Sequence, residues 1–279
     1  MYFMMEPWSH RVAYGWAVIL LLFVAFLDCS VFGFGLRPPI AVYTRFAPRW
    51  QSSAGETLIA VSPSGIDAWP EPAQAAVFFG AFLALGACTL PATKALDQVS
   101  KVIGLEKWRI NVIDTTFPIL LGAFYLTAGA GHFLNADSFR SIYPPQGTWG
   151  LWFLPGSPAF HVAWTGIAEL LGGGGLLWGG LQSALSIANE GKEPNRDHYN
   201  YAPWANLTKP VSALTLLVLT LIVTPSNIYM YTHGATFGHT GPLDVSFHGV
   251  RFLAQVCLLS VLFTLAKDSF FFTWGDELD

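Results

Sequence analysis

Six long apolar stretches constrain the fold of this chain more than any other feature. A helix needs about 20 mostly apolar residues to cross the hydrocarbon core of a bilayer, which is roughly 30 Å thick. Backbone groups in lipid must find their hydrogen bonds within the spanning structure, and the chain lacks the alternating segments of about ten residues that build a barrel. We therefore expect an all-α, multi-pass membrane bundle of about six transmembrane helices. The stretches are approximately Val12–Leu36, Ala73–Pro91, Val112–Leu134, Ala159–Leu181, Val211–Met230 and Phe247–Ala266, of which the second is the weakest.

The composition agrees with this class and excludes others. Hydrophobic residues make up 53% of the chain and charged residues only 11%, whereas soluble domains carry about 25% charge. A net charge of -4 argues against nucleic acid as a partner. The N-terminal sequence MYFMMEPWSHR has neither the pattern of a cleavable signal peptide nor that of a transit peptide. Cys29, Cys88 and Cys257 lie in apolar stretches without CxxC spacing, so we expect small buried hydrophobic residues rather than disulfides or metal ligands.

The basic residues predict an orientation. Six spans place both termini on one side, which would hold nine lysines and arginines against five on the other side, so the termini are predicted on the cytoplasmic, stromal or matrix side. We divide the chain into residues 1–110, a two-span extension with a long outer loop over Arg37–Pro72, and residues 111–279, a four-helix membrane domain. Ala95–Arg109 alternates apolar and charged residues and is expected to form either a short interfacial helix or a linker.

Polar residues from five of the spans are predicted to gather in the outer half of the bundle. Charges within a membrane are costly, so each is a candidate functional residue. Glu169 lies near the middle of the fourth span and would be neutral without a partner, and we expect Arg251 to pair with it through a bidentate bond. Two interpretations stay open, a structural ion pair in a tight bundle and a pocket for a ligand or proton. The residues are Asp28, His132, His161, Glu169, Asn227, His248 and Arg251.

Two further features bear on the site. Seven glycines in GIAELLGGGGLLWGG, residues 166–180, remove side chains and would let a neighbouring helix or a ligand ring approach closely. Pro225, in TPSNIYMY, is expected to break the fifth helix just before Asn227.

The histidines do not have the spacing of a metal site. No pair lies at i,i+4 and no HExxH is present. His132, His161 and His248 lie at span ends and are, with Asn227, candidates for binding a pigment or a quinone; the alternative for each histidine is a hydrogen bond to backbone or water. The chain also lacks a Rossmann fingerprint, a P-loop, CxxCH and a nucleophile elbow.

The last four spans read, in order, FYLTAGAGHF, IYPP, GIAELLGGGGLL and TPSNIYM, followed by a basic residue early in the final span. This order resembles the DoxX-like family of four-helix membrane proteins, over roughly residues 111–267. The resemblance implies links to quinone reduction or to sulfur and thiol oxidation. The chain departs from the family pattern in its two N-terminal spans, in an insertion over Gly150–Pro158 and in lacking exposed cysteines. The positions carried over are His132, Pro144, Pro145, Glu169, Pro225, Asn227 and Arg251.

Three functions are weighed. The favoured one is a non-catalytic accessory subunit of a larger membrane electron-transfer assembly, in particular a photosystem-antenna complex of the thylakoid membrane, with chlorophyll, carotenoid and lipids as neighbours. The alternative is a quinone- or quinol-binding oxidoreductase subunit in which Glu169 carries the proton and Arg251 tunes it. A weaker alternative is a proton-coupled transporter. A bacterial inner membrane and a mitochondrial inner membrane are the other locations considered.

Overall fold

The computed structural model describes residues 62–102, 109–190, 203–238 and 241–274, and within them all regular structure is helical. This confirms the all-α class for the described part of the chain, whereas the predicted span Val12–Leu36 and Asp28 lie outside it. The elements are η2 (Ile66–Ala68), α2 (Glu71–Val102), η3 (Arg109–Thr116), α4 (Phe117–Leu134), α5 (Ala136–Ser141), η4 (Thr148–Gly150), α6 (Pro158–Glu190), α7 (Pro203–His233) and α8 (Val245–Trp274).

Four of these helices are long and apolar enough to cross a membrane. They match the expected second, third, fifth and sixth spans and occupy Glu71–Gln98, Asn111–Leu134, Leu207–His233 and Val245–Lys267. The expected fourth span lies in α6, which has 33 residues but is less apolar because it contains the seven glycines and Glu169. The structure thus supports an integral membrane protein, and a total of about six spans stays a prediction.

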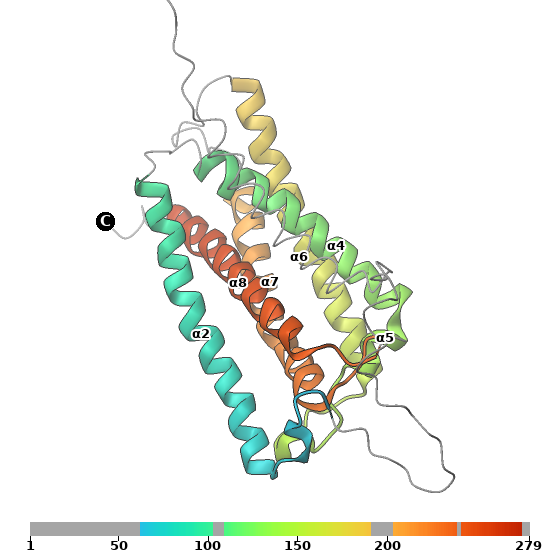
Figure 1. Ribbon diagram of the computed structural model, residues 1–279. Helices are drawn as coiled ribbons and strands as arrows, with labels where there is room; N and C mark the ends of the chain where they lie inside the picture. Colours follow the sequence, from blue (N-terminus) through green and yellow to red (C-terminus); the bar gives the residue numbers. More distant parts are fainter. Residues whose placement is uncertain (1–61, 103–108, 191–202, 239–240, 275–279) are drawn as a thin grey trace, which may run out of the picture.

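The long helices pack in a row that determines where a cavity can form. α7 and α8 lie between α2 on one side and the α4–α6 pair on the other (Figure 1). The closely packed pairs are α4 with α6, α6 with α7, α7 with α8 and α8 with α2. α4 and α8 are not such a pair. A cavity can therefore form between these two helices wherever their side chains do not fill the space.

Glycines bring α4 and α6 into backbone contact. A Cβ atom on Gly173 would lie 2.9 Å from the Gly122 carbonyl oxygen and from the Leu126 amide nitrogen, and one on Gly129 would lie 2.8 Å from the Gly166 carbonyl oxygen. Distances this short are not compatible with a side chain, so the helices approach closely only because these residues are glycines. The predicted role of the glycine-rich stretch in close helix packing is therefore present.

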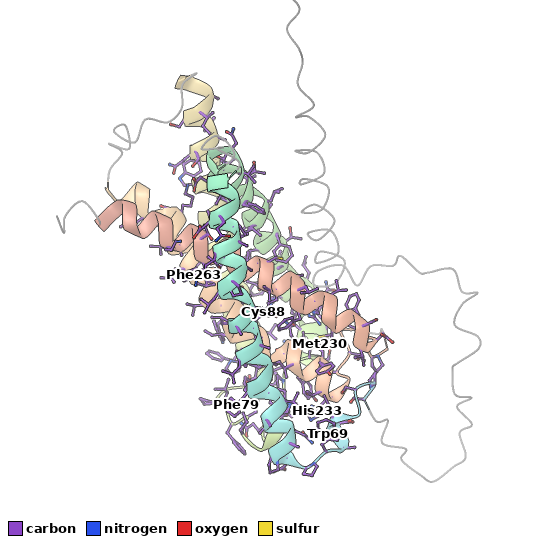
Figure 2. The ribbon with its side chains drawn as sticks, turned by 60° about the vertical axis from the view of Figure 1, so that its left-hand side comes forward. Trp69, Phe79, Cys88, Met230, His233 and Phe263 are labelled. Carbon is purple, nitrogen blue, oxygen red and sulfur yellow. The ribbon has the colours of Figure 1, made fainter. Side chains whose placement is uncertain are left out.

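Residues 62–70, 135–157 and 234–238 cover one end of the bundle, and we call them the cap. Trp149 is 2% exposed and donates its indole N–H to Thr232 Oγ1 at 3.0 Å. Its ring centroid lies 4.6 Å from that of Phe78 on α2. Ser62 Oγ donates to the Thr232 carbonyl oxygen at 3.0 Å. Trp69 and His233 lie at this end of the bundle in Figure 2. The cap therefore joins α2, α7 and the segment before α6 through buried contacts.

Three sequence-based expectations are changed by the helices. Pro225 does not break α7, which continues to His233; a proline removes one backbone hydrogen bond, and packing in the bundle supports the helix across it. Cys88 and Cys257 are exposed, not buried, because a helix face directed at lipid is as apolar as one directed at a core. α2 runs through Val102, so the first part of the expected interfacial helix belongs to α2, and residues 103–108 lie outside the described part.

Candidate functional site

A cavity of about 170 Å³ lies between α4, α6, α7, α8 and the cap. Its walls are apolar over most of their area, with polar groups at a few positions. Five of the predicted site residues line it: His132, His161, Glu169, Asn227 and Arg251. The sixth described candidate, His248, does not line the cavity, and its ring lies 5.4 Å from that of Tyr231. The predicted convergence of polar residues from different spans is thus present for five of them.

Glu169 pairs with a histidine. Its Oε2 lies 3.4 Å from Nε2 of His132, and both residues are 7% exposed. The predicted bidentate bond to Arg251 is not among the ion pairs of the described residues. Arg251 donates to Asn227 Oδ1 at 2.8 Å and to Met230 Sδ at 3.0 Å. The reason is the packing order, because α7 is the direct neighbour of α8 and offers acceptors closer to Arg251 than α6 does.

The other ring nitrogen of His132 is held by the start of α6. Nδ1 lies 2.9 Å from the Val162 carbonyl oxygen and 3.2 Å from Thr165 Oγ1. A carbonyl only accepts, so Nδ1 carries a proton and Nε2 of a neutral ring is the acceptor that faces Glu169. The ring also lies 3.8 Å from that of Phe139 in the cap. His132 and Glu169 can therefore share one proton, as carboxylic acid with imidazole or as carboxylate with imidazolium.

Both nitrogens of His161 are already engaged. Nε2 donates to the Pro155 carbonyl oxygen at 2.9 Å, and Nδ1 accepts the indole N–H of Trp164 at 3.1 Å. The ring stacks on Tyr143 with centroids 5.0 Å apart and planes 17° apart. This geometry positions the loop before α6 and the Tyr143 ring, and a ligand atom could bond His161 only by replacing Pro155 or Trp164.

A polar network lines the α7–α8 side of the cavity. Asn227 Nδ2 donates to Gln255 Oε1 at 3.3 Å, and Gln255 Nε2 donates to Thr224 Oγ1 at 2.6 Å. The network continues from the Arg251–Asn227 bond, so the amides on this wall have partners within the protein. Within the described part of the chain, no three histidine, cysteine or acidic side chains lie close enough to hold a metal ion.

Three buried polar atoms of the described residues have no hydrogen-bond partner: Glu169 Oε2, Tyr143 Oη and Trp152 Nε1. All three residues line the cavity. Burial raises the pKa of Tyr143, and the nearby indole of Trp152 only partly offsets this effect. The phenol and the indole are adjacent, but they do not reach hydrogen-bond geometry with each other. Buried polar groups are almost always satisfied in folded proteins, so the three exceptions around one cavity are candidate positions for contact with a ligand.

Tyr143 and Trp152 were not among the predicted site residues. Tyr143 precedes the Pro-Pro turn, and Trp152 lies in the segment Gly150–Pro158 that departs from the family pattern. The direction of an aromatic side chain in a loop does not follow from sequence periodicity. Only the loop conformation shows that these two residues line the cavity.

No protein-family model, curated protein or solved structure matches this chain. The resemblance to the DoxX-like family therefore stays a prediction, and the function rests on the site itself.

Proposed function

We propose that the cavity binds the ring of a quinone or quinol and that Glu169 and His132 exchange a proton with the ring oxygen. The observation that carries this proposal is the buried Glu169 carboxyl group on the cavity wall, whose Oε2 lies 3.4 Å from His132 Nε2 but makes no hydrogen bond in good geometry. A buried carboxyl group on the wall of a cavity can donate or accept a proton when a ligand oxygen reaches it.

The size and lining of the cavity support a single ring. A cavity of about 150 Å³ lined by leucine, isoleucine and phenylalanine accepts benzene, and this one has about 170 Å³. Phe124, Leu219 and Leu258 supply apolar surface from α4, α7 and α8. A porphyrin macrocycle is several times larger than a benzene ring, so chlorophyll does not suit the cavity.

The chemistry divides between this chain and a redox partner. Reduction of a quinone to a quinol takes up two electrons and two protons. In the proposal the one proton that Glu169 and His132 share passes to one quinone oxygen and is then replaced from water, which also supplies the proton for the second oxygen. The electrons come from a partner subunit, which is consistent with a place in a membrane electron-transfer assembly.

The test uses the full-length protein in lipid nanodiscs. The protein is titrated with a short-tailed benzoquinone, and isothermal titration calorimetry measures the binding. We expect saturable binding to the wild type. Glu169→Leu should weaken binding by about tenfold, the order expected for one hydrogen bond to a charged or buried group, because leucine can neither donate nor accept. The matched control is Glu71→Leu, because Glu71 is exposed at the start of α2 and should change nothing. Absent saturable binding, or equal losses in both variants, would refute the proposal.

The broader expectation of a non-catalytic subunit in a photosynthetic assembly remains a second proposal. Pigments would then lie on the outer helix faces, and α2 offers such a face through the exposed side chains of Phe79, Leu83 and Leu90. An absorption spectrum of the particle extracted gently from its native membrane separates the two. Chlorophyll and carotenoid bands would support the antenna assembly and a thylakoid location, whereas extractable quinone without such bands would leave only the quinone site.

A further inference from the structure

We infer that the ligand of this cavity carries a polar oxygen at each of two ends, and that Trp152 and Tyr143 bind the end opposite Glu169. This inference rests on the proposed quinone site and identifies the ligand more narrowly, as a para-quinone or para-quinol, in which the two oxygens lie on opposite carbons of the ring. It also assigns a binding role to a segment, Gly150–Pro158, that the resemblance does not cover.

Trp152 and Tyr143 each have a buried polar atom without a hydrogen-bond partner. An indole N–H is only a donor, and a phenol can donate or accept. Leaving a buried donor unpaired is unfavourable, and Trp152 Nε1 and the adjacent Tyr143 Oη do not reach hydrogen-bond geometry with each other, so a ligand oxygen that reaches this pair would satisfy both. Other polar side chains of the cavity wall are already bonded within the protein: Tyr125, His132, His161, Thr220, Asn227, Arg251 and Gln255.

Tyr143 and Glu169 lie at different depths along α6. Tyr143 stacks on His161, which precedes Glu169 by eight residues on α6. At about 1.5 Å per residue, the Cα atoms of His161 and Glu169 are about 12 Å apart along the helix axis, so Tyr143 lies toward the cap and Glu169 deeper in the bundle. A six-membered ring with an oxygen at each end can present one oxygen to each of these levels, whereas a ring with a single oxygen would leave one end unpaired.

Backbone hydrogen bonds and a ring contact hold Trp152 in place within the cap. The Trp152 amide donates to the Thr148 carbonyl oxygen at 3.1 Å, and its own carbonyl oxygen accepts the Gly147 amide at 2.8 Å. Its ring lies 6.0 Å from that of Trp149, with planes at 90°. Gly147 and Gly150 have positive φ angles of 85° and 70°, which suit glycine. The indole N–H is therefore held in place before a ligand arrives, which is how a protein lowers the entropic cost of binding.

The experiment compares two probes that differ by one hydroxyl group, tetramethylhydroquinone and 2,3,5,6-tetramethylphenol. Binding to the full-length protein in nanodiscs is measured by calorimetry without oxygen. We expect the wild type to prefer the hydroquinone by at least about tenfold, because the phenol leaves one end without its hydrogen bond. Tyr143→Phe and Trp152→Phe should each reduce this preference, while Glu169→Leu, which removes the hydrogen-bonding group, weakens the binding of both probes.

The control is Tyr229→Phe, because Tyr229 is a half-buried tyrosine near the cap that does not line the cavity. It should keep the wild-type preference. Equal affinity of the wild type for both probes would overturn the inference and leave the proposed function standing, since it would mean that water satisfies Trp152. Failure of both probes to bind would instead overturn the proposed function.

Discussion

At the scale of single residues, Thr232 connects three parts of the molecule. It is fully buried, its hydroxyl donates to the Ile228 carbonyl oxygen at 2.9 Å, and the same oxygen accepts the Trp149 indole N–H. Its backbone carbonyl oxygen accepts the Ser62 hydroxyl. The end of α7 is therefore joined to the segment before α2 and to the loop before α6 at one position.

Thr232→Val is expected to lower the free energy of unfolding by about 1–3 kcal/mol, because valine keeps the shape but leaves the Trp149 N–H buried without an acceptor. Thermal unfolding in detergent, with several probes to check for a single transition, measures the change. Thr127→Val is the matched control, since the exposed Thr127 hydroxyl bonds only to the Ala123 carbonyl oxygen of its own helix. A loss as large in the control as in Thr232→Val would contradict the assignment.

At the scale of elements, the α4–α6 pair depends on which glycines face the neighbouring helix. Gly173 and Gly174 are adjacent in the sequence but face different surroundings. A Cβ on Gly173 would lie 2.9 Å from backbone atoms of α4, whereas a Cβ on Gly174 would have only a leucine methyl group of Leu126 nearby, at 3.9 Å. One run of four glycines therefore contains both indispensable and replaceable positions.

Gly173→Ala should lower the free energy of unfolding by about 1–3 kcal/mol, the usual effect of overpacking, because the backbone of α4 cannot move aside as a side chain could. Gly174→Ala should be neutral or stabilising by up to about 1 kcal/mol, since alanine favours the helix over glycine. Unfolding of both variants in a mixed-micelle SDS titration gives the comparison. If the two alanines had the same effect, the close packing would not be the cause.

At the scale of the whole molecule, the expected topology places α6 across the membrane although it is not among the four helices that are long and apolar enough to cross one. Glu169 and the seven glycines belong to this helix, which also forms one wall of the cavity. A spanning α6 would shield its polar groups within the bundle, whereas a helix lying outside the bilayer would leave the cavity open to water.

Cysteine labelling tests this topology. In a variant whose native cysteines at positions 29, 88 and 257 are replaced by alanine, Ser157→Cys and Ala188→Cys place thiols at the two ends of α6, both at exposed positions. A membrane-impermeant maleimide added to sealed vesicles should label the two from opposite sides. Labelling of both from one side would show that α6 does not cross the bilayer.

The sequence allowed the helices and the meeting of polar residues to be predicted, but not the pairs they form. Hydropathy locates α2, α4, α7 and α8 because lipid demands long apolar segments. The partner of Glu169 depends on which helices are direct neighbours, and hydropathy carries no information on packing order. The same limit explains Cys88 and Cys257, since lipid and a protein core select equally apolar residues. Tyr143 and Trp152 depend on a loop with several positive φ angles, and neither their position nor their direction follows from periodicity.

The cap closes one end of the cavity, while α4 and α8, which both line it, are not among the closely packed helix pairs. A ligand that enters between these two helices comes from the hydrocarbon phase and not from water. The membrane then acts as the reservoir, and occupancy follows the number of ligand molecules per lipid. Two preparations with the same total ligand concentration but different amounts of lipid would show different apparent affinities, and agree once concentration is expressed as a mole fraction in the bilayer.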